Sequence, residues 1–568
     1  MQGNPFDETN SNAEDHLLIK GGDPLYDILI PSNPPRGVEH AANFLQAELK
    51  KLCKCNFAIL KQPRSGRGFI SLGNTPQARG LTALPKGLGE EGYEIQSKKQ
   101  AIFIRADHPM GQVNGILAFL EEDLGIRWWG KFPKESQYPV AKPLIASIKS
   151  RITKPAFEYR EPFYSAIQSK HYIDRNRIRA SRGVGRNPVN PWNPYRLYPA
   201  GYAQHSFRDL VPGAEFAKSH PEYYSEKNGV RRVPDASNYG TQLCLSNREL
   251  AKVVARRAQK VLDEQPHARL IHISQNDGKG MFCDCDRCTK INKEEGSRAG
   301  SLIYFINQVA EQVEKTHPEV KVVTFAYQET ATPPRKIRPR DNVIIELCAT
   351  ANWEKPFQPI SENSKFVKQL DGWQRLGSEV YVWDYSISQN HYLQPLPNIE
   401  AMARNIRFYR DKGVKGVMLQ GAYQNNSQGA ARALLKSWVW GKLMWNPDLD
   451  AQELSRSFTE AMYGEAAGPV LRYNAILHQY WESAYRSGNI SGDLLPNDFQ
   501  SKALKLIAEA RKLTNDPEKL THIAYWEASV LYARVRKGPL NKSDLKAYNE
   551  DLTRFEKICK QYDIRRLR

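Results

Sequence analysis

Residues 155–430 repeat one pattern, in which short apolar, β-branched segments alternate with amphipathic segments of helical period. This alternation is typical of a parallel sheet built from β-α units. Eight strands can be read from it, which is the number that a closed barrel needs. They are 157–163, 201–207, 241–245, 269–277, 321–329, 342–350, 379–386 and 414–423. The predicted fold class is therefore α/β, a (β/α)8 TIM barrel.

Helical patterns between these strands, at 249–263, 301–315 and 399–412, complete the β-α units. An open doubly wound sheet is the alternative architecture. No glycine-rich phosphate loop follows any of the strands, so the sequence favours the barrel.

The segments on either side of the barrel have different patterns. Residues 16–145 combine strands and helices and predict a small α+β domain, with strands at 26–30, 68–73, 91–96 and 101–106 and helical patterns at 38–52 and 112–125. Residues 431–568 contain helical patterns without strands, at 431–445, 451–463, 470–487, 498–513, 517–536 and 543–562. We therefore expect three domains, 16–145, 155–430 and 431–568.

The chain of 568 residues carries a net charge of +19, from 81 Lys and Arg against 62 Asp and Glu. A basic surface favours acidic partners such as nucleic acid or glycans with sialic or uronic acids. The basic residues are scattered and form no nucleic-acid-binding motif, so no nucleic-acid partner is predicted. No run of eighteen apolar residues occurs, and no membrane span is predicted.

The first residues, MQGNPFDETNSNAED, lack the basic and apolar regions of a signal peptide. A polar leader of this kind suits a mature secreted, periplasmic or cell-surface protein, including a lipoprotein without its lipidated cysteine. A cytosolic start is the alternative.

Cys283, Cys285 and Cys288 form a tight CxCxxC group among eight cysteines. Three thiolates at this spacing supply most of a tetrahedral zinc site, but no fourth ligand is evident nearby. A disulfide or free structural thiols are the alternatives, and no metal is assigned to the active site.

The predicted strands end in polar or ionisable residues, and in a barrel of this type the strand ends form the active site. Asp277 is the last residue of the predicted fourth strand, Glu329 is the last residue of the fifth, and Asp384 lies at the end of the seventh. Hydrolysis of a glycosidic bond needs a carboxylic acid to protonate the leaving oxygen and a second group to stabilise or attack the anomeric centre. Asp277, Glu329 and Asp384 are therefore the candidate catalytic residues.

Asn276 and Asp277 are adjacent, which suits cleavage assisted by the substrate's own acetamide group. Asp277 would be the acid, and Asn276 would hold the acetamide. Each acid also has a structural interpretation: Asp277-Gly278 as a turn, Glu329 as part of a loop-bracing salt bridge, and Glu346 as a paired acid inside its strand.

Sugars present apolar faces and hydroxyl groups, so their sites combine aromatic platforms with planar hydrogen-bonding side chains. Both kinds of side chain occur near the predicted strand ends. The candidate substrate-binding residues are His205, Gln275, Asn276, Tyr327, Gln328, Trp353, Trp383, Tyr385, His391, Gln420 and Tyr423.

Several motifs together resemble a bacterial domain assigned to glycoside hydrolase family 163. They are SQNDG followed by CDCDRC, AYQET with TPP behind it, VWDYS with HYLQPLPN behind it, and VKGVMLQGAY. The segment 16–145 is also similar to the small α+β domain that precedes the barrel in α-glucuronidases and family 20 hexosaminidases. The resemblance implies an endo-β-N-acetylglucosaminidase that cuts the chitobiose core of complex N-glycans, in secreted or surface enzymes of gut bacteria.

The leading hypothesis is a retaining, substrate-assisted hydrolase without a cofactor, with a glycan or glycoprotein as substrate and Asp277 and Glu329 as the pair. The alternative enzyme is a retaining glycosidase with Asp277 as acid and Asp384 as protein nucleophile, acting on uronic-acid or hexosamine glycans. The third hypothesis is a non-catalytic glycan-binding protein.

Overall fold

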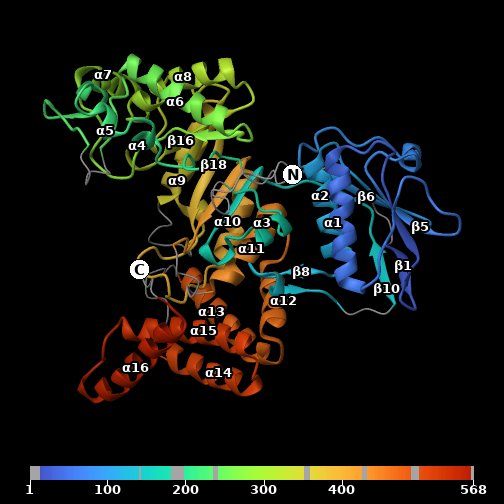
Figure 1. The fold of residues 1–568 in the computed structure, drawn as a ribbon. Helices are drawn as coiled ribbons and strands as arrows, with labels where there is room; N and C mark the ends of the chain where they lie inside the picture. Colours follow the sequence, from blue (N-terminus) through green and yellow to red (C-terminus); the bar gives the residue numbers. More distant parts are fainter. Residues whose placement is uncertain are drawn as a thin grey trace. The chain divides into compact units, whose positions relative to one another are not determined.

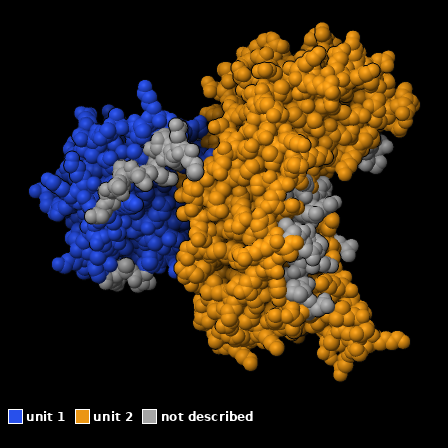
Figure 2. All heavy atoms as spheres, turned by 180° about the vertical axis from the view of Figure 1, so that it is seen from behind, with its two compact units in different colours: residues 1–156, 169–177, 188–194 blue, residues 157–168, 178–187, 195–568 orange. Residues whose placement is uncertain are grey.

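The chain divides into two compact units, which Figure 2 shows in blue and orange. The computed structural model describes residues 13–139, 143–180, 197–234, 241–350, 358–424, 432–487 and 498–564. The first unit consists of 1–156, 169–177 and 188–194, and the second of 157–168, 178–187 and 195–568. None of the described helices combines the length and the apolar composition that crossing a membrane requires.

The first unit is built on a six-stranded mixed sheet with the order β11-β6-β7-β5-β3-β4. These strands are β3 (Tyr26–Leu29), β4 (Ile59–Leu60), β5 (Gly68–Leu72), β6 (Tyr93–Lys98), β7 (Ala101–Arg105) and β11 (Arg151–Thr153). A second sheet has the order β10-β1-β2, with β1 (Glu14–Lys20), β2 (Asp23–Pro24) and β10 (Leu144–Ile148). The four strands predicted for this region are confirmed, at β3, β5, β6 and β7.

Two helices of the first unit, α1 (Arg36–Cys53) and α2 (Pro109–Ala118), pack against each other (Figure 1). Both were predicted from their apolar spacing. Gly37 lies where α1 meets α2, and a Cβ at this position would come 2.3 Å from Cβ of Pro109. Beyond Ala118 the chain continues as a π-helical stretch, Phe119–Asp123.

The second unit is built on a six-stranded sheet with the order β12-β19-β18-β17-β16-β15. Every neighbouring pair in it is parallel. The strands are β12 (Tyr159–Phe163), β15 (Leu270–His272), β16 (Lys321–Ala326), β17 (Val343–Cys348), β18 (Glu379–Tyr385) and β19 (Gly416–Gln420). Six of the eight predicted strands are therefore present, and they form a half-barrel.

The prediction of strands at 201–207 and 241–245 is wrong. Residues 201–206 form turns that lead into α4 (Phe207–Leu210), and 241–245 makes only an isolated antiparallel bridge, from Leu243 to Tyr224. In the described residues, no regular strand joins β15 to β12.

Irregular backbone lies along β15 where a barrel would have its next strand. The amide groups of Arg269 and Leu270 donate to the carbonyl of Leu197, and that of His272 donates to Tyr202. The amide of Phe207 in turn donates to the carbonyl of Ser274. These hydrogen bonds satisfy the backbone of the edge strand without a regular ladder.

The inner face of the half-barrel follows the two-residue period of β-strands. Alternate residues of each strand join one buried cluster, which contains Tyr159, Phe163, Leu270, Val323, Phe325, Ile344, Cys348, Tyr381, Trp383, Tyr385 and Met418. Residues between them face the helices outside. This alternation decides which strand-end residues can reach a site inside the half-barrel.

The second unit contains the helices α6 (Arg248–Glu264), α7 (Asp286–Glu295), α8 (Ala299–Thr316), α9 (Ser364–Arg375) and α10 (Ile399–Asp411). The helical patterns predicted at 249–263, 301–315 and 399–412 correspond to α6, α8 and α10, whereas α7 and α9 were not among the predicted helices. Asn247 caps α6, because its side chain accepts a hydrogen bond from the amide of Leu250. The helix α6 then packs against α8 (Figure 1).

In the described part of the C-terminal region, six α-helices follow the sheet, as predicted (Figure 1). They are α11 (Ala433–Trp445), α12 (Ala451–Tyr463), α13 (Ala467–Arg486), α14 (Phe499–Leu513), α15 (Pro517–Val535) and α16 (Leu545–Gln561). They belong to the same compact unit as the half-barrel.

Candidate active site

A cavity opens at the carboxyl ends of the half-barrel strands, where the inner face ends. It contains about 730 Å³ of space, part of which is open to solvent. Its lining residues are Phe163, Gln204, His205, Asp277, Phe325, Tyr327, Cys348, Trp383, Tyr385, Gln389, Gln420 and Tyr423. A mostly aromatic wall with a few polar groups is the usual composition of a small-molecule site.

Asp277 is the only carboxylate among the described residues that line this cavity. It follows β15 and is exposed. Its Oδ1 accepts hydrogen bonds from the Tyr327 hydroxyl at 3.2 Å and from the Gly278 amide at 3.0 Å. No described residue donates to its Oδ2, so this oxygen is available to a ligand.

Tyr327 orients the Asp277 carboxylate. Burial, and next the charge of Asp277, raises the pKa of the Tyr327 phenol, so it stays protonated and acts as a donor. Gln328, another predicted site residue, acts behind it, because its Nε2 donates to the Tyr327 hydroxyl at 2.6 Å.

Asn276 and Gln275 were predicted to bind substrate, but neither lines the cavity. Asn276 Nδ2 donates to the carbonyl of Thr241 at 2.5 Å, and its Oδ1 accepts from the amide of Arg208 at 3.0 Å. Gln275 Oε1 accepts from Thr330 Oγ1 at 2.7 Å. Both amides hold the loop that carries Asp277, so the prediction that Asn276 holds an acetamide is wrong.

His205 lines the cavity, as predicted. Its Nδ1 lies 2.8 Å from the carbonyl of Gln275, which can only accept, so Nδ1 carries the proton. Burial lowers the pKa of His205, which keeps the ring neutral. In this tautomer Nε2 is an acceptor, and no described residue donates to it. The backbone of His205 has φ 42°, a strained value for a residue with a side chain.

Glu329 does not line the cavity, although it was predicted to form the catalytic pair with Asp277. Its Oε1 accepts from the amide of Gly280 at 2.6 Å, and its Oε2 pairs with Arg298 Nε at 2.9 Å. Both oxygens are therefore engaged in holding the loop after Asp277. The structure corrects the catalytic assignment to the alternative one, a loop-bracing ion pair.

We expect Glu329→Gln to change kcat by less than about tenfold, because it removes an ion pair that is partly exposed and contributes about 0–1 kcal/mol. Glu329→Ala should cost more, since the Gly280 amide also loses its acceptor. Steady-state kinetics of both variants check this. A loss of several orders of magnitude in Glu329→Gln would restore its catalytic role.

Asp384 is fully buried and faces away from the cavity. Its Oδ2 accepts from Tyr409 Oη at 2.7 Å and Asn405 Nδ2 at 3.2 Å, both on α10. The neighbours Trp383 and Tyr385 line the cavity, and the two-residue period places Asp384 between them on the opposite face. Its assignment as a nucleophile is therefore wrong.

Glu346 is buried on the inner face and lies with its Oε2 3.0 Å from His272 Nε2. It does not line the cavity. This is the paired acid that the sequence offered as the structural interpretation.

Aromatic and amide side chains from other segments than the one that carries Asp277 form a wall of the cavity. Trp383 Nε1 donates to Gln420 Oε1 at 2.7 Å, and Gln420 Nε2 donates to Gln389 Oε1 at 3.3 Å. Tyr423 stacks on Phe163, with 4.8 Å between ring centroids. The predictions for Trp383, Tyr385, Gln420 and Tyr423 as cavity residues agree with their positions.

Two other predicted binding residues do not meet at the cavity. His391 Nδ1 lies 2.8 Å from the hydroxyl of Tyr532 on α15, and His391 does not line the cavity. Trp353 lies outside the described residues.

Gln204 and Gln389 are cavity residues that the sequence reasoning missed. Buried polar atoms without protein partners lie on both, Oε1 of Gln204 and Nε2 of Gln389. One is an acceptor and the other a donor, which are the groups that a sugar hydroxyl or amide would satisfy. Gln204 precedes His205, and Gln389 lies two residues before His391 in SISQNHY. The sequence therefore points to these segments, but it singles out their histidines and not their glutamines.

Residues 131–475 match the family described as a domain of unknown function, DUF4838. The chain belongs to this family. The matched DUF4838 region contains every residue that lines the cavity, whereas α14, α15 and α16 lie beyond it. No curated protein matches the chain in sequence.

The DUF4838 chain is similar in fold to a family GH115 4-O-methyl-α-glucuronidase with specificity for decorated arabinogalactans. The TM-score is 0.58 at 11% identity, over 96% of this chain and 76% of that chain. A chitobiase from Flavobacterium johnsoniae aligns over 98% of this chain and 100% of that chain, with a TM-score of 0.45 and 11% identity. The first likeness shows that the fold is one that glycoside hydrolases use.

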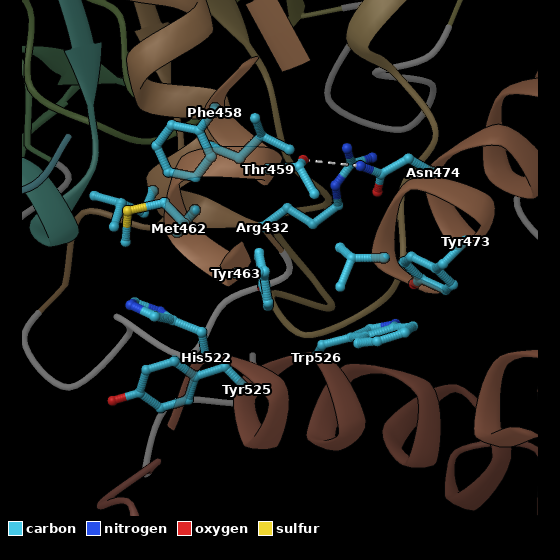
Figure 3. Close-up of a pocket in the computed structure, with 14 residues that line it drawn as sticks. Arg432, Phe458, Thr459, Met462, Tyr463, Tyr473, Asn474, His522, Tyr525 and Trp526 are labelled. Carbon is cyan, nitrogen blue, oxygen red and sulfur yellow. Dashed lines mark hydrogen bonds between the residues drawn. The ribbon is translucent and has the colours of Figure 1, made fainter. Parts of the chain in front are cut away.

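A second cavity, of about 610 Å³, lies among the C-terminal helices of the DUF4838 chain (Figure 3). Figure 3 shows Tyr463, Tyr473 and Trp526 around it with Arg432, whose pKa is lowered to about 10 by burial. No carboxylate occurs among the described residues that line it. It therefore lacks an acid for hydrolysis, and the cavity with Asp277 is the candidate active site.

Proposed function

We propose that the protein is a retaining endo-β-N-acetylglucosaminidase that cleaves the chitobiose core of complex N-glycans with assistance from the substrate's acetamide. The observation that carries the proposal is a single described carboxylate, Asp277, in a cavity walled by aromatic and amide side chains. A mechanism with a protein nucleophile needs a second carboxylate about 5–5.5 Å away. The substrate's own amide removes that requirement.

In the first step, the Asp277 carboxylic acid gives its proton to the glycosidic oxygen as the bond to the anomeric carbon breaks. The acetamide carbonyl oxygen attacks that carbon from the opposite face and closes an oxazolinium ring. In the second step, the Asp277 carboxylate takes a proton from water, and the water oxygen opens the ring. Two inversions at the anomeric carbon give net retention.

The unpaired amide atoms suggest how the acetamide is oriented. Gln204 Oε1 is a buried acceptor, suited to the acetamide N–H, and this bond would make the carbonyl oxygen a better nucleophile. Gln389 Nε2 is a donor suited to a sugar hydroxyl. The Trp383 and Tyr385 rings offer apolar faces for the sugar's C–H groups. Gln204 thus replaces Asn276 in the orienting role.

The resemblance of the CDCDRC, AYQET and VWDYS motifs to glycoside hydrolase family 163 supports this substrate. Glycoproteins with complex N-glycans occur outside the bacterial cytoplasm, so the proposal places the enzyme in a secreted, periplasmic or cell-surface setting. A glycan-binding protein without activity is disfavoured by the exposed, correctly placed Asp277.

The test is to incubate the full chain with a glycoprotein that carries complex N-glycans, a chitooligosaccharide and a glucuronic-acid oligosaccharide, and to analyse products by mass spectrometry. We expect release of a complex glycan that leaves one N-acetylglucosamine on asparagine. A substrate with N-trifluoroacetyl in place of N-acetyl should react far more slowly, because its carbonyl oxygen is less nucleophilic. Equal rates would exclude acetamide assistance.

The second candidate function is hydrolysis of uronic-acid glycans. The fold likeness to a 4-O-methyl-α-glucuronidase and the net charge of +19 favour it. A uronate carboxylate calls for Arg or Lys in its subsite. Neither occurs among the described residues that line the cavity. Release of glucuronic acid in the same assay would make this the function.

A further inference from the structure

Four cysteine thiols converge in the second unit, close to the loop that carries Asp277. Cys283 and Cys285 follow that loop, Cys288 lies in the first turn of α7, and Cys244 lies 39 residues before Cys283 in the chain. All four are buried, and their Sγ atoms lie within 4.8 Å of one another. Cys244 is the fourth ligand that the sequence did not reveal.

The sulfur positions fit a shared metal ion. In a tetrahedral site with metal–sulfur bonds of about 2.3 Å, neighbouring sulfur atoms are about 3.8 Å apart. The Sγ atoms of Cys244 and Cys285 are 3.7 Å apart. Sulfur atoms of a disulfide are separated by about 2.05 Å. The spacing therefore matches coordination and not oxidised pairs.

Groups around the cluster suit negatively charged thiolates. The backbone amide of Glu226 donates to Cys283 Sγ at 3.2 Å, and Arg231 Nη1 lies 3.8 Å from the same sulfur. The hydroxyl of Ser246 lies 3.2 Å from Cys288 Sγ. Cys285 stands at the N-cap of α7, whose positive end favours a thiolate. Such outer contacts commonly accompany metal ligands.

The donor set indicates the metal and its role. Four thiolates in tetrahedral arrangement select zinc or iron among common biological metals. All four ligand positions are filled by sulfur, which is the composition of a structural site and leaves no position for water or substrate. Hydrolysis requires no redox centre. We propose that Cys244, Cys283, Cys285 and Cys288 bind one structural Zn²⁺.

The zinc site fastens the segments that support the candidate acid. Cys244 follows Gln242, whose side chain bonds the backbone of Asn276 on both sides, at 2.7 and 3.0 Å. The amide of Asp284, between two ligands, donates to the carbonyl of Glu226 at 2.8 Å. Glu226 belongs to the short hairpin of β13 (Glu226–Lys227) and β14 (Val230–Arg231). One ion thus joins three irregular segments that have little core of their own.

The test begins with the unmodified full chain, purified without chelators and analysed for metals by mass spectrometry. We expect about one zinc per chain, and loss of that zinc in Cys244→Ser and Cys288→Ser. Cys559→Ser, which changes a half-buried cysteine outside the cluster, is the matched control and should keep it. Metal content of the unmodified chain decides the matter even where a variant fails to fold.

Two further measurements identify the ligands and the structural effect. Replacement of zinc by Co²⁺ should give the near-ultraviolet sulfur-to-cobalt charge-transfer bands and intense visible bands of a tetrathiolate. Removal of the metal should accelerate tryptic cleavage at the exposed Lys279 and Arg287 by tenfold or more. Iron in place of zinc, four thiols without metal, or a mass four hydrogens low from two disulfides would each overturn the proposal.

Discussion

Replacement of Asp277 by Asn is expected to lower kcat on a complex N-glycoprotein by about 10²- to 10⁴-fold, the usual contribution of a general acid. The variant keeps the side-chain size and an acceptor for the Tyr327 hydroxyl, but it cannot release a proton to the leaving oxygen. Because Asp277 is exposed, the free energy of unfolding should change by less than about 0.5 kcal/mol. Glycan release and chemical denaturation measure the two effects.

The leaving group gives this prediction a sharper form. An aryl glycoside with an acidic phenol departs with little protonation, so Asp277→Asn should slow its first step much less than it slows cleavage of the glycoprotein. A surface change of the same kind, Asp263→Asn, is the control and should leave both rates unchanged. If the loss is the same for every leaving group, Asp277 is not the acid.

The helices could be predicted from the sequence because their apolar residues recur at the helical period. The pattern at 399–412 corresponds to α10, where Met402, Ile406 and Tyr409 are buried on one face. The pattern at 451–463 coincides with α12. The predicted bounds also lie close to the observed ones, since the pattern at 249–263 corresponds to α6 at Arg248–Glu264.

The strands of the half-barrel could be predicted from the sequence only where they pair with neighbouring strands in the sheet. Runs such as 342–350 are apolar and β-branched, and β17 is buried throughout. The segments 201–207 and 241–245 have strand-like composition, but neither forms a ladder. The first makes separate backbone hydrogen bonds with His272 and Ser274, and the second forms an isolated bridge between Leu243 and Tyr224. Which of these outcomes occurs depends on long-range contacts, and local composition does not encode them.

The location of the candidate site could be predicted from the sequence, but the direction in which individual side chains point could not. A one-residue shift along a strand reverses the face, so Trp383 and Tyr385 line the cavity while Asp384 does not. Asp277 and Glu329 both follow strands, yet Arg298 and Gly280 occupy the Glu329 oxygens. Cys244 could not be predicted as the fourth ligand from the sequence, because only the folded chain brings it beside the CxCxxC group.

The second large effect is expected at Asp384, and it should be on stability. Asp384→Ala leaves the Tyr409 hydroxyl, the Asn405 amide and the Tyr385 backbone amide without the acceptor they now share. Because each buried donor left without an acceptor costs about 1–3 kcal/mol, the free energy of unfolding should fall by about 3 kcal/mol or more. Chemical denaturation followed by tryptophan fluorescence measures the change.

Asp384→Asn separates this structural role from catalysis. The amide keeps one acceptor oxygen, but its NH2 group meets the Asn405 amide, whose own oxygen already accepts from Ile360. A stability loss of about 1–3 kcal/mol is therefore expected.

The folded fraction of Asp384→Asn should keep kcat within about fivefold, because Asp384 is fully buried and does not line the cavity. A protein nucleophile would behave in the opposite way, with intact stability and a kcat lower by several orders of magnitude. Since Asp277→Asn should lose rate and keep stability, the pair of Asn variants assigns the chemistry to one carboxylate and the packing to the other.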